Sequence, residues 1–187
     1  MRKLIYAINV TLDGCCDHRQ VAGGADVMDY YTRMVREVDT FVYGRKTYEL
    51  MVPYWPNVAK DHEGQSKPEI EFAEAFCAVP QVVVFSKTLD RVEAKNTRIV
   101  RGNLQDEILR LKQESGKPLL AGGVDVASQL MELGLIDEYR IVVGPVIAGK
   151  GRRLFDEVGL PERLRLKLVE SRTFDKSGCV GLRYVPT

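Results

Sequence analysis

Residues 42–49 read VYGRKTYE, a short apolar run followed by a glycine, two cations and a threonine. The pattern predicts a buried strand that ends at Gly44 and a helix that begins directly after it. A strand-to-helix turn needs only the glycine. Arg45, Lys46 and Thr47 add positive charge and a hydroxyl donor at the N-terminus of the expected helix, where unpaired N–H groups already attract anions. The stretch therefore predicts an anion contact at this junction.

Two further junctions follow the same pattern. In FSKTL, Ser86 and Lys87 follow an apolar run, and in LLAGG, Gly122 and Gly123 precede an expected helix. Ligands of α/β sheets bind where parallel strands end and helices begin. Glycines let a phosphate approach the backbone, and the cations and hydroxyls supply charge and donors. Each junction alone is also explained as an ordinary turn or a solvated strand edge, so the prediction of a phosphate site rests on the three together.

The order of expected elements indicates the fold class. Strand-like and helix-like segments alternate over the first two thirds of the chain, which predicts a mostly parallel sheet, and the last third adds a closing antiparallel pair of strands. We expect one α/β domain over residues 1–187. Strands are expected at 3–10, 40–44, 81–86, 97–102, 117–123, 136–149, 164–174 and 179–187. Helices are expected at 25–38, 68–79, 103–115 and 124–134, and a further helix begins at residue 45. A long surface loop is expected at 53–68.

Composition excludes several function classes. The chain has 187 residues, 45% of them hydrophobic and 28% charged, with a formal net charge of +1. These values are typical of an ordinary soluble domain and argue against a nucleic-acid partner or an anionic membrane surface. No apolar stretch is long enough to span a bilayer, and no secretory signal is visible. The four cysteines match no zinc pattern, so we expect no metal site. Since no secretory signal is visible, we expect the thiols to be reduced and the protein to be cytoplasmic.

The cations also favour one dinucleotide over another. No GxGxxG fingerprint is present, which argues against the common Rossmann loop. Proteins that bind NAD place a carboxylate near the adenosine ribose, whereas proteins that bind NADP place cations there. Lys87 follows a strand at such a position, and Asp90 nearby argues in the opposite direction. The balance favours NADPH as the cofactor.

Five motifs together resemble a known family. GRKTYE, VVVFSKTL and LLAGGVDVASQLM resemble the cofactor frame of the dihydrofolate reductase-like fold. NVTLDG and GPVIAGKGRRLF resemble its riboflavin-biosynthesis branch, which includes the C-terminal reductase domain of the bifunctional deaminase/reductase (RibD). The resemblance covers nearly the whole chain. It implies a largely eight-stranded sheet, helices on both faces, NADPH across the carboxyl edge of the strands, and a homodimer.

The resemblance also implies roles for individual residues in cofactor binding. The adenosine-side phosphates would be contacted by Gly44, Arg45, Lys46 and Thr47, and the 2′-phosphate by Ser86 and Lys87. The pyrophosphate and its neighbourhood would be lined by Gly122, Gly123, Val124, Asp125 and Val126. The nicotinamide would be approached by Ala7 and Ile8.

The candidate acids near the substrate are less well defined. Folate reductases carry one acidic residue early in the helix that precedes GRKT, and here Asp26 and Asp29 straddle the corresponding position, Met28. We take Asp29 as a candidate catalytic acid and Asp26 as a candidate substrate contact. An acid near a helix start is also favourable electrostatically, which explains both residues without any function.

The riboflavin-type motifs supply further candidates. Asp13 in TLDG is a candidate for catalysis and for substrate binding, and Asn9 is a candidate hydrogen-bonding partner. Lys150 and Arg152 would form a clamp for a phosphorylated sugar. The structural alternatives are an Asp-Gly turn for the first motif and a solvated glycine-rich bend for the second.

The sequence as a whole predicts an NADPH-dependent reductase that acts on a small heterocyclic or sugar-derived substrate. Its closest named activity is reduction of 5-amino-6-(5-phosphoribosylamino)uracil, in which a ribosyl group becomes ribityl. Dihydrofolate reduction is the alternative within enzymes, and a nucleotide-binding or regulatory module without turnover is the alternative outside them. The zinc signature of a deaminase is absent from the sequence.

Overall fold

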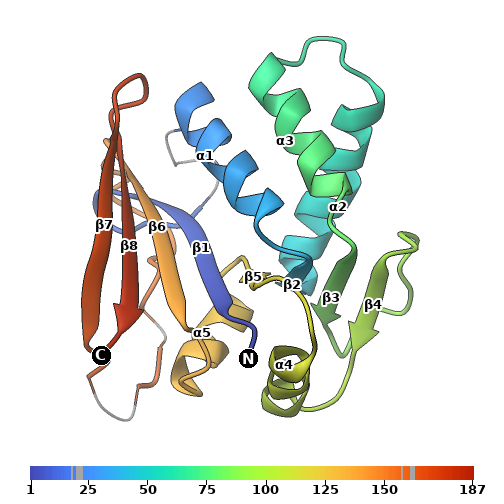
Figure 1. Cartoon of the computed structure of the whole chain (residues 1–187). Helices are drawn as coiled ribbons and strands as arrows, with labels where there is room; N and C mark the ends of the chain where they lie inside the picture. The colour runs from blue at the N-terminus through green and yellow to red at the C-terminus, as the bar shows by residue number, and fades with distance from the viewer. Residues whose placement is uncertain (18, 20–22, 157, 161–162) are drawn as a thin grey trace.

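The chain forms one central sheet (Figure 1), seen here in a computed structural model that describes residues 1–17, 19, 23–156, 158–160 and 163–187. The strands are β1 (Leu4–Thr11), β2 (Thr40–Gly44), β3 (Gln81–Phe85), β4 (Thr97–Val100), β5 (Leu119–Ala121), β6 (Glu138–Gly144), β7 (Leu166–Phe174) and β8 (Cys179–Pro186). The described residues form an eight-stranded sheet in the order β4-β3-β2-β5-β1-β6-β8-β7. The strands from β4 to β6 are parallel, and β8 and β7 are antiparallel, as the sequence predicted.

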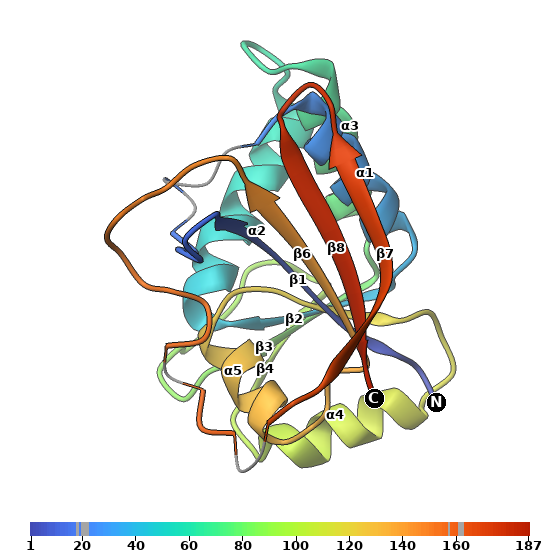
Figure 2. The same ribbon diagram turned by 90° about the vertical axis from the view of Figure 1, so that its left-hand side faces the viewer.

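Helices cover both faces of the sheet (Figures 1 and 2). They are α1 (Ala25–Arg36), α2 (Arg45–Lys60), α3 (Lys67–Cys77), α4 (Leu104–Gln113) and α5 (Asp125–Glu132). Helices α1, α2 and α3 pack on one face over a core that includes Phe41 and Val84, and α4 and α5 pack on the other over Val42 and Val83. Alternate residues of one strand therefore enter opposite cores, as expected for a sheet buried on both faces.

The predicted loop at 53–68 is wrong over its first half, because α2 continues through Pro53 and Pro56 to Lys60. Each proline removes a backbone donor and would normally interrupt a helix. Packing maintains the helix here: Val52 and Val58 are buried, and the Trp55 ring lies 4.5 Å from that of Phe72 on α3. Tertiary burial thus outweighs the local preference for a turn.

Lys112 is a charged side chain in the core, with only 5% of its surface exposed. It fastens α4 to the start of β6, because its Nζ lies 2.6 Å from Asp137 Oδ2 and donates to the carbonyl of Leu135 at 3.1 Å. We expect Lys112→Met to lower the free energy of unfolding by about 2 kcal/mol, since it removes the donor to the Leu135 carbonyl and the ion pair of Asp137, whose carboxylate then keeps the Leu4 N–H. Urea unfolding measures this, with Lys60→Met at an exposed helical site as the control, and equal losses for both variants would contradict it.

No helix within the described residues is both long enough and apolar enough to cross a membrane.

Candidate active site

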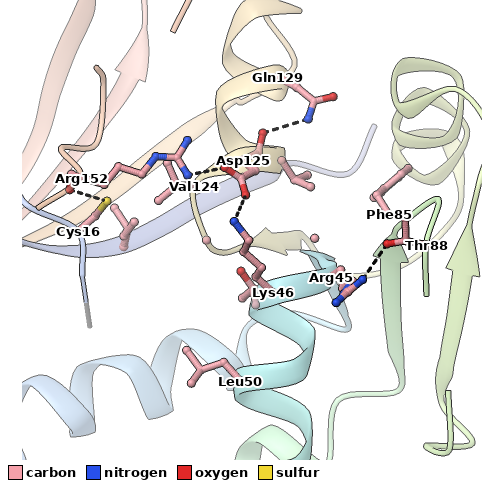
Figure 3. Close-up of a pocket in the computed structure, with 15 residues that line it drawn as sticks. Cys16, Arg45, Lys46, Leu50, Phe85, Thr88, Val124, Asp125, Gln129 and Arg152 are labelled. Carbon is pink, nitrogen blue, oxygen red and sulfur yellow. Dashed lines mark hydrogen bonds and ion pairs between the residues drawn. The ribbon is translucent and has the colours of Figure 1, made fainter. Parts of the chain in front are cut away.

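The three predicted junctions meet at the carboxyl edge of the sheet. Strands β3, β2 and β5 are neighbours, Gly44 lies opposite Phe85, and the Gly122 N–H donates to the carbonyl of Val42. A groove of about 830 Å³ opens beyond this edge (Figure 3). Its lining consists of Ile8, Cys16, Gly44, Arg45, Lys46, Thr47, Leu50, Phe85, Thr88, Gly123, Val124, Asp125, Val126, Gln129 and Arg152.

The N-termini of two helices face this groove. Helix α2 begins at Arg45, with Lys46 and Thr47 following in the lining, and its first turn carries no acidic residue. Helix α5 begins at Asp125, directly after a glycine loop. Unpaired N–H groups at a helix N-terminus carry partial positive charge, so two such termini across one groove form a place for an anion.

Close packing explains the glycine that precedes α5. Gly123 has φ = +84°, and a Cβ at this position would lie 2.1 Å from Thr47 Oγ1. The Tyr6 hydroxyl donates to the Gly123 carbonyl at 2.9 Å and holds the loop in place. Burial raises the pKa of Tyr6 further above neutral pH, so this hydroxyl is protonated and can donate. The loop before α5 therefore lies against the first turn of α2, with no space for a side chain between them.

A second hollow of about 360 Å³ continues the groove past β3. It shares Phe85, Val126 and Gln129 with the groove and is lined further by Ser86, Lys87, Val100, Arg101, Gly102, Asn103 and Leu104. Ser86 Oγ accepts from the N–H groups of Thr88 and Leu89 at 3.2 and 2.9 Å, which leaves its own proton for donation. Lys87 is exposed. These residues can hold a second anionic group beside the first.

Ion pairs and hydrogen bonds arrange the cations of the groove (Figure 3). Arg45 contacts Glu49 and Thr88, both at 2.9 Å, and so links α2 to the loop after β3. Asp125 forms an ion pair with Arg152 and lies 3.9 Å from Lys46 Nζ. Charge from three separate segments therefore meets within one groove.

The end of β1 supplies the opposite part of the lining. Ala7 and Ile8 are half-buried, and Ile8 faces the groove. Asn9 Oδ1 accepts from the Tyr31 hydroxyl at 2.5 Å, which fixes the orientation of the amide. The Cys16 thiol donates to the Arg152 carbonyl at 3.2 Å, and desolvation raises its pKa. A thiol in this state is a poor nucleophile at neutral pH.

The Asp13 carboxylate holds the loop after β6. It accepts from Thr11 Oγ1 at 2.6 Å and from the N–H groups of Ala148 and Gly149 at 3.0 and 2.9 Å, and Arg153 lies within 3.7 Å. The hydrogen bonds, led by that from Thr11, lower the pKa of Asp13 to about 2. Asp13 is not in the groove lining, and its predicted catalytic and substrate-binding roles remain predictions.

These contacts predict a pH-dependent contribution to stability. The folded-state pKa of Asp13 is depressed, so its contribution is complete above its unfolded pKa of about 4 and is lost as the pH falls through about 2. We expect Asp13→Asn to unfold at lower urea than the parent chain at pH 6, with a smaller difference at pH 2.5. Urea midpoints at both pH values check this, and a difference that is unchanged at low pH would contradict it.

Most of the remaining predicted catalytic and substrate residues lie outside the groove lining. Asp26 accepts from the backbone N–H groups of Lys176 and Ser177 at 2.9 and 3.2 Å, and so ties the start of α1 to the β7–β8 turn. Asp29 is half-buried on α1. Lys150 is exposed and lines neither the groove nor its extension, whereas Arg152 reaches the groove.

The sequence prediction missed several lining residues, among them Arg101, Gln129, Phe85, Leu50 and Cys16. Arg101 carries a signal that could have identified it, because it follows β4 as Arg45 follows β2. Its guanidinium donates to the Leu89 carbonyl at 2.7 Å and braces the loop that carries Lys87. Gln129 and Leu50 lie inside helices, where nothing local distinguishes them from other surface residues.

Among proteins of similar sequence is the uncharacterised protein YyaP of Bacillus subtilis strain 168. It is 31% identical over 188 residues, a match that covers 98% of this chain and 94% of that one. Two solved structures are similar in fold. One is a protein from Shewanella sp. PV-4 that is provisionally named as a riboflavin biosynthesis protein. It matches with a TM-score of 0.74 and 23% identity over 99% of both chains.

The second structure is a dihydrofolate reductase from Enterococcus faecalis, complexed with NADP(H). It matches with a TM-score of 0.65 and 13% identity, over 99% of this chain and 96% of that one. At these identities the two structures show that the fold is dihydrofolate reductase-like. The family model for the RibD C-terminal domain matches residues 2–180. This chain therefore belongs to the RibD C-terminal domain family.

Proposed function

We propose that this protein is an NADPH-dependent reductase whose cofactor lies along the groove and its extension past β3. The observation that carries the proposal is the meeting of two helix N-termini, α2 and α5, across a groove that also contains Arg45 and Lys46. Membership of the RibD C-terminal domain family supports a reductase-like activity.

The residues fit a dinucleotide with a third phosphate. The Gly123 loop and Thr47 form a cradle that a Cβ on residue 123 would fill. Without that Cβ, a pyrophosphate can come close enough to accept hydrogen bonds from the backbone N–H groups. Ser86 and Lys87 in the adjoining hollow would hold the 2′-phosphate through a hydroxyl donor and a cation. Ile8 at the end of β1 would lie beside the nicotinamide.

The chemistry divides between cofactor and protein. The cofactor, when bound, supplies hydride, and the protein positions the acceptor and excludes water. Asn9, whose amide is oriented by Tyr31, would hydrogen-bond the substrate near the end of β1. Asp29 and Asp13 remain the proposed catalytic residues, Asp13 as a carboxylate that its hydrogen bonds keep ionised. Asp13, Asp26, Lys150 and Arg152 remain the proposed substrate contacts. The proposed substrate is 5-amino-6-(5-phosphoribosylamino)uracil or a related sugar-derived heterocycle.

Loss of NADPH absorbance at 340 nm, with the purified chain and each candidate substrate, tests the proposal. Oxidation with 5-amino-6-(5-phosphoribosylamino)uracil is the expected result, and oxidation with dihydrofolate alone would support the alternative enzyme. Tight NADPH binding without turnover on either substrate would indicate a nucleotide-binding module. Absence of NADPH binding in calorimetry would refute a cofactor role for the groove.

The family resemblance further leads us to propose a twofold homodimer. Sedimentation equilibrium of the full chain is expected to give twice the chain mass of 21.1 kDa, and a monomer mass at micromolar concentration would refute it.

A further inference from the structure

A carboxylate lies where the proposed function places a phosphate. Asp125 is the first residue of α5 and lines the groove beside Gly123 and Lys46. An acid in the first turn of a helix is favourable on its own, because it faces the positive end of the helix dipole. At this helix the same position is also the one that an incoming anion would take, so the two negative groups compete for it.

Asp125 also contacts two of the groove's cations (Figure 3). Its Oδ1 forms an ion pair with Arg152, which comes from the loop after β6, and its Oδ2 lies 3.9 Å from Nζ of Lys46, on α2. Contacts among these three side chains therefore link α2, α5 and the loop after β6 within the groove lining. About half of the Asp125 side chain is exposed (51%), so the carboxylate can turn outward without breaking core packing.

The base of Arg152 is fixed although its guanidinium is not buried. Its carbonyl accepts from the Cys16 N–H at 2.9 Å and from the Cys16 thiol at 3.2 Å, which ties the backbone to the segment after β1. The side chain is 37% exposed. Arg152 can therefore exchange one anionic partner for another by side-chain rotation alone.

We propose that Asp125 acts as an internal competitor for the cofactor's phosphates. This inference rests on the proposed function. In the free protein the carboxylate holds Arg152 and Lys46 across the groove, and in the complex the pyrophosphate takes over these cations while Asp125 turns outward. The residue thereby sets the affinity for the dinucleotide below the value that the cradle alone would give, and it favours release of the oxidised cofactor after turnover.

Calorimetry with NADPH on the full chain tests the proposal through Asp125→Asn, which keeps the shape of the side chain and removes its charge. We expect binding about fivefold tighter than in the parent chain, because a competing charge at an exposed site is worth about 1 kcal/mol. The gain should shrink in about 1 M potassium chloride, where exposed charges are screened. Glu74→Gln is the matched control, since it removes one exposed carboxylate from α3, beside the opposite edge of the sheet, and should leave the affinity unchanged.

The outcomes separate this inference from the function on which it rests. If the parent chain binds NADPH and Asp125→Asn binds equally or more weakly, the competitor role is wrong and the proposed function stands. If neither protein binds NADPH, the proposed function fails and the inference fails with it. A crystal structure of the NADPH complex gives a second readout: we expect the Asp125–Arg152 pair to be open, and an intact pair beside bound cofactor would overturn the proposal.

Discussion

Replacing Gly123 with alanine is expected to lower the affinity for NADPH on the order of a hundredfold and the free energy of unfolding by about 3 kcal/mol. The added Cβ would lie 2.1 Å from Thr47 Oγ1, in a backbone conformation (φ = +84°) that side chains rarely adopt. The loop before α5 must then separate from the first turn of α2. The N–H groups on the two sides of the cradle would no longer converge on one phosphate, which accounts for the larger effect on binding.

Gly64→Ala is the matched control for backbone strain. Gly64 has a similar φ of +73°, lies in the segment between α2 and α3, and would meet nothing within 4 Å. This variant should lose about 1 kcal/mol of stability and keep its cofactor affinity. Urea unfolding and calorimetry on both variants measure the two effects. Similar NADPH affinities in Gly123→Ala and Gly64→Ala would mean that the contact with Thr47 has no part in binding.

Reversing the charge of Lys87 is expected to separate the two nicotinamide dinucleotides. In Lys87→Glu we expect the dissociation constant for NADPH to rise about a hundredfold, because a charge-assisted contact is lost and a repulsive one replaces it. The constant for NADH should change less than about threefold, since NADH has no 2′-phosphate for this hollow to hold. Calorimetric titration of each dinucleotide gives both constants.

Lys95→Glu controls for the change in net charge. Lys95 is exposed in the segment between β3 and β4, and it borders a hollow beside α3 that is separate from the groove. Its reversal should affect both dinucleotides little. Equal losses for NADPH and NADH in Lys87→Glu would place the 2′-phosphate elsewhere, and Arg101 would then be the next cation to test.

The sequence was informative where local chemistry decides the structure. The strand predicted at 40–44 coincides with β2, because an apolar β-branched run ended by a glycine has few other solutions. The junctions at Gly44, Ser86 and Gly122 could be placed at one edge because parallel strands direct their carboxyl ends the same way. Their convergence in one groove and its extension also requires that β3, β2 and β5 are neighbours in the sheet, which the sequence prediction did not specify.

The sequence was less informative where partners are distant along the chain. Asp13 accepts from Gly149, 136 residues away, and Arg152 pairs with Asp125, 27 residues away. Such pairs depend on how the loop after β6 returns over the end of β1, which no local pattern encodes. The extension of α2 through Pro53 and Pro56 was missed for a related reason, since the packing that permits it comes from α3.

The position of the last strand has a consequence for biosynthesis. Strand β8 lies between β6 and β7, although it follows both of them along the chain. Until Cys179–Pro186 emerges, β6 has an unpaired edge and β7 has no neighbour in the sheet. The nascent chain thus presents an open template for pairing with other chains until β8 has been made, and ribosome stalling or premature termination shortly before Cys179 would release an aggregation-prone product.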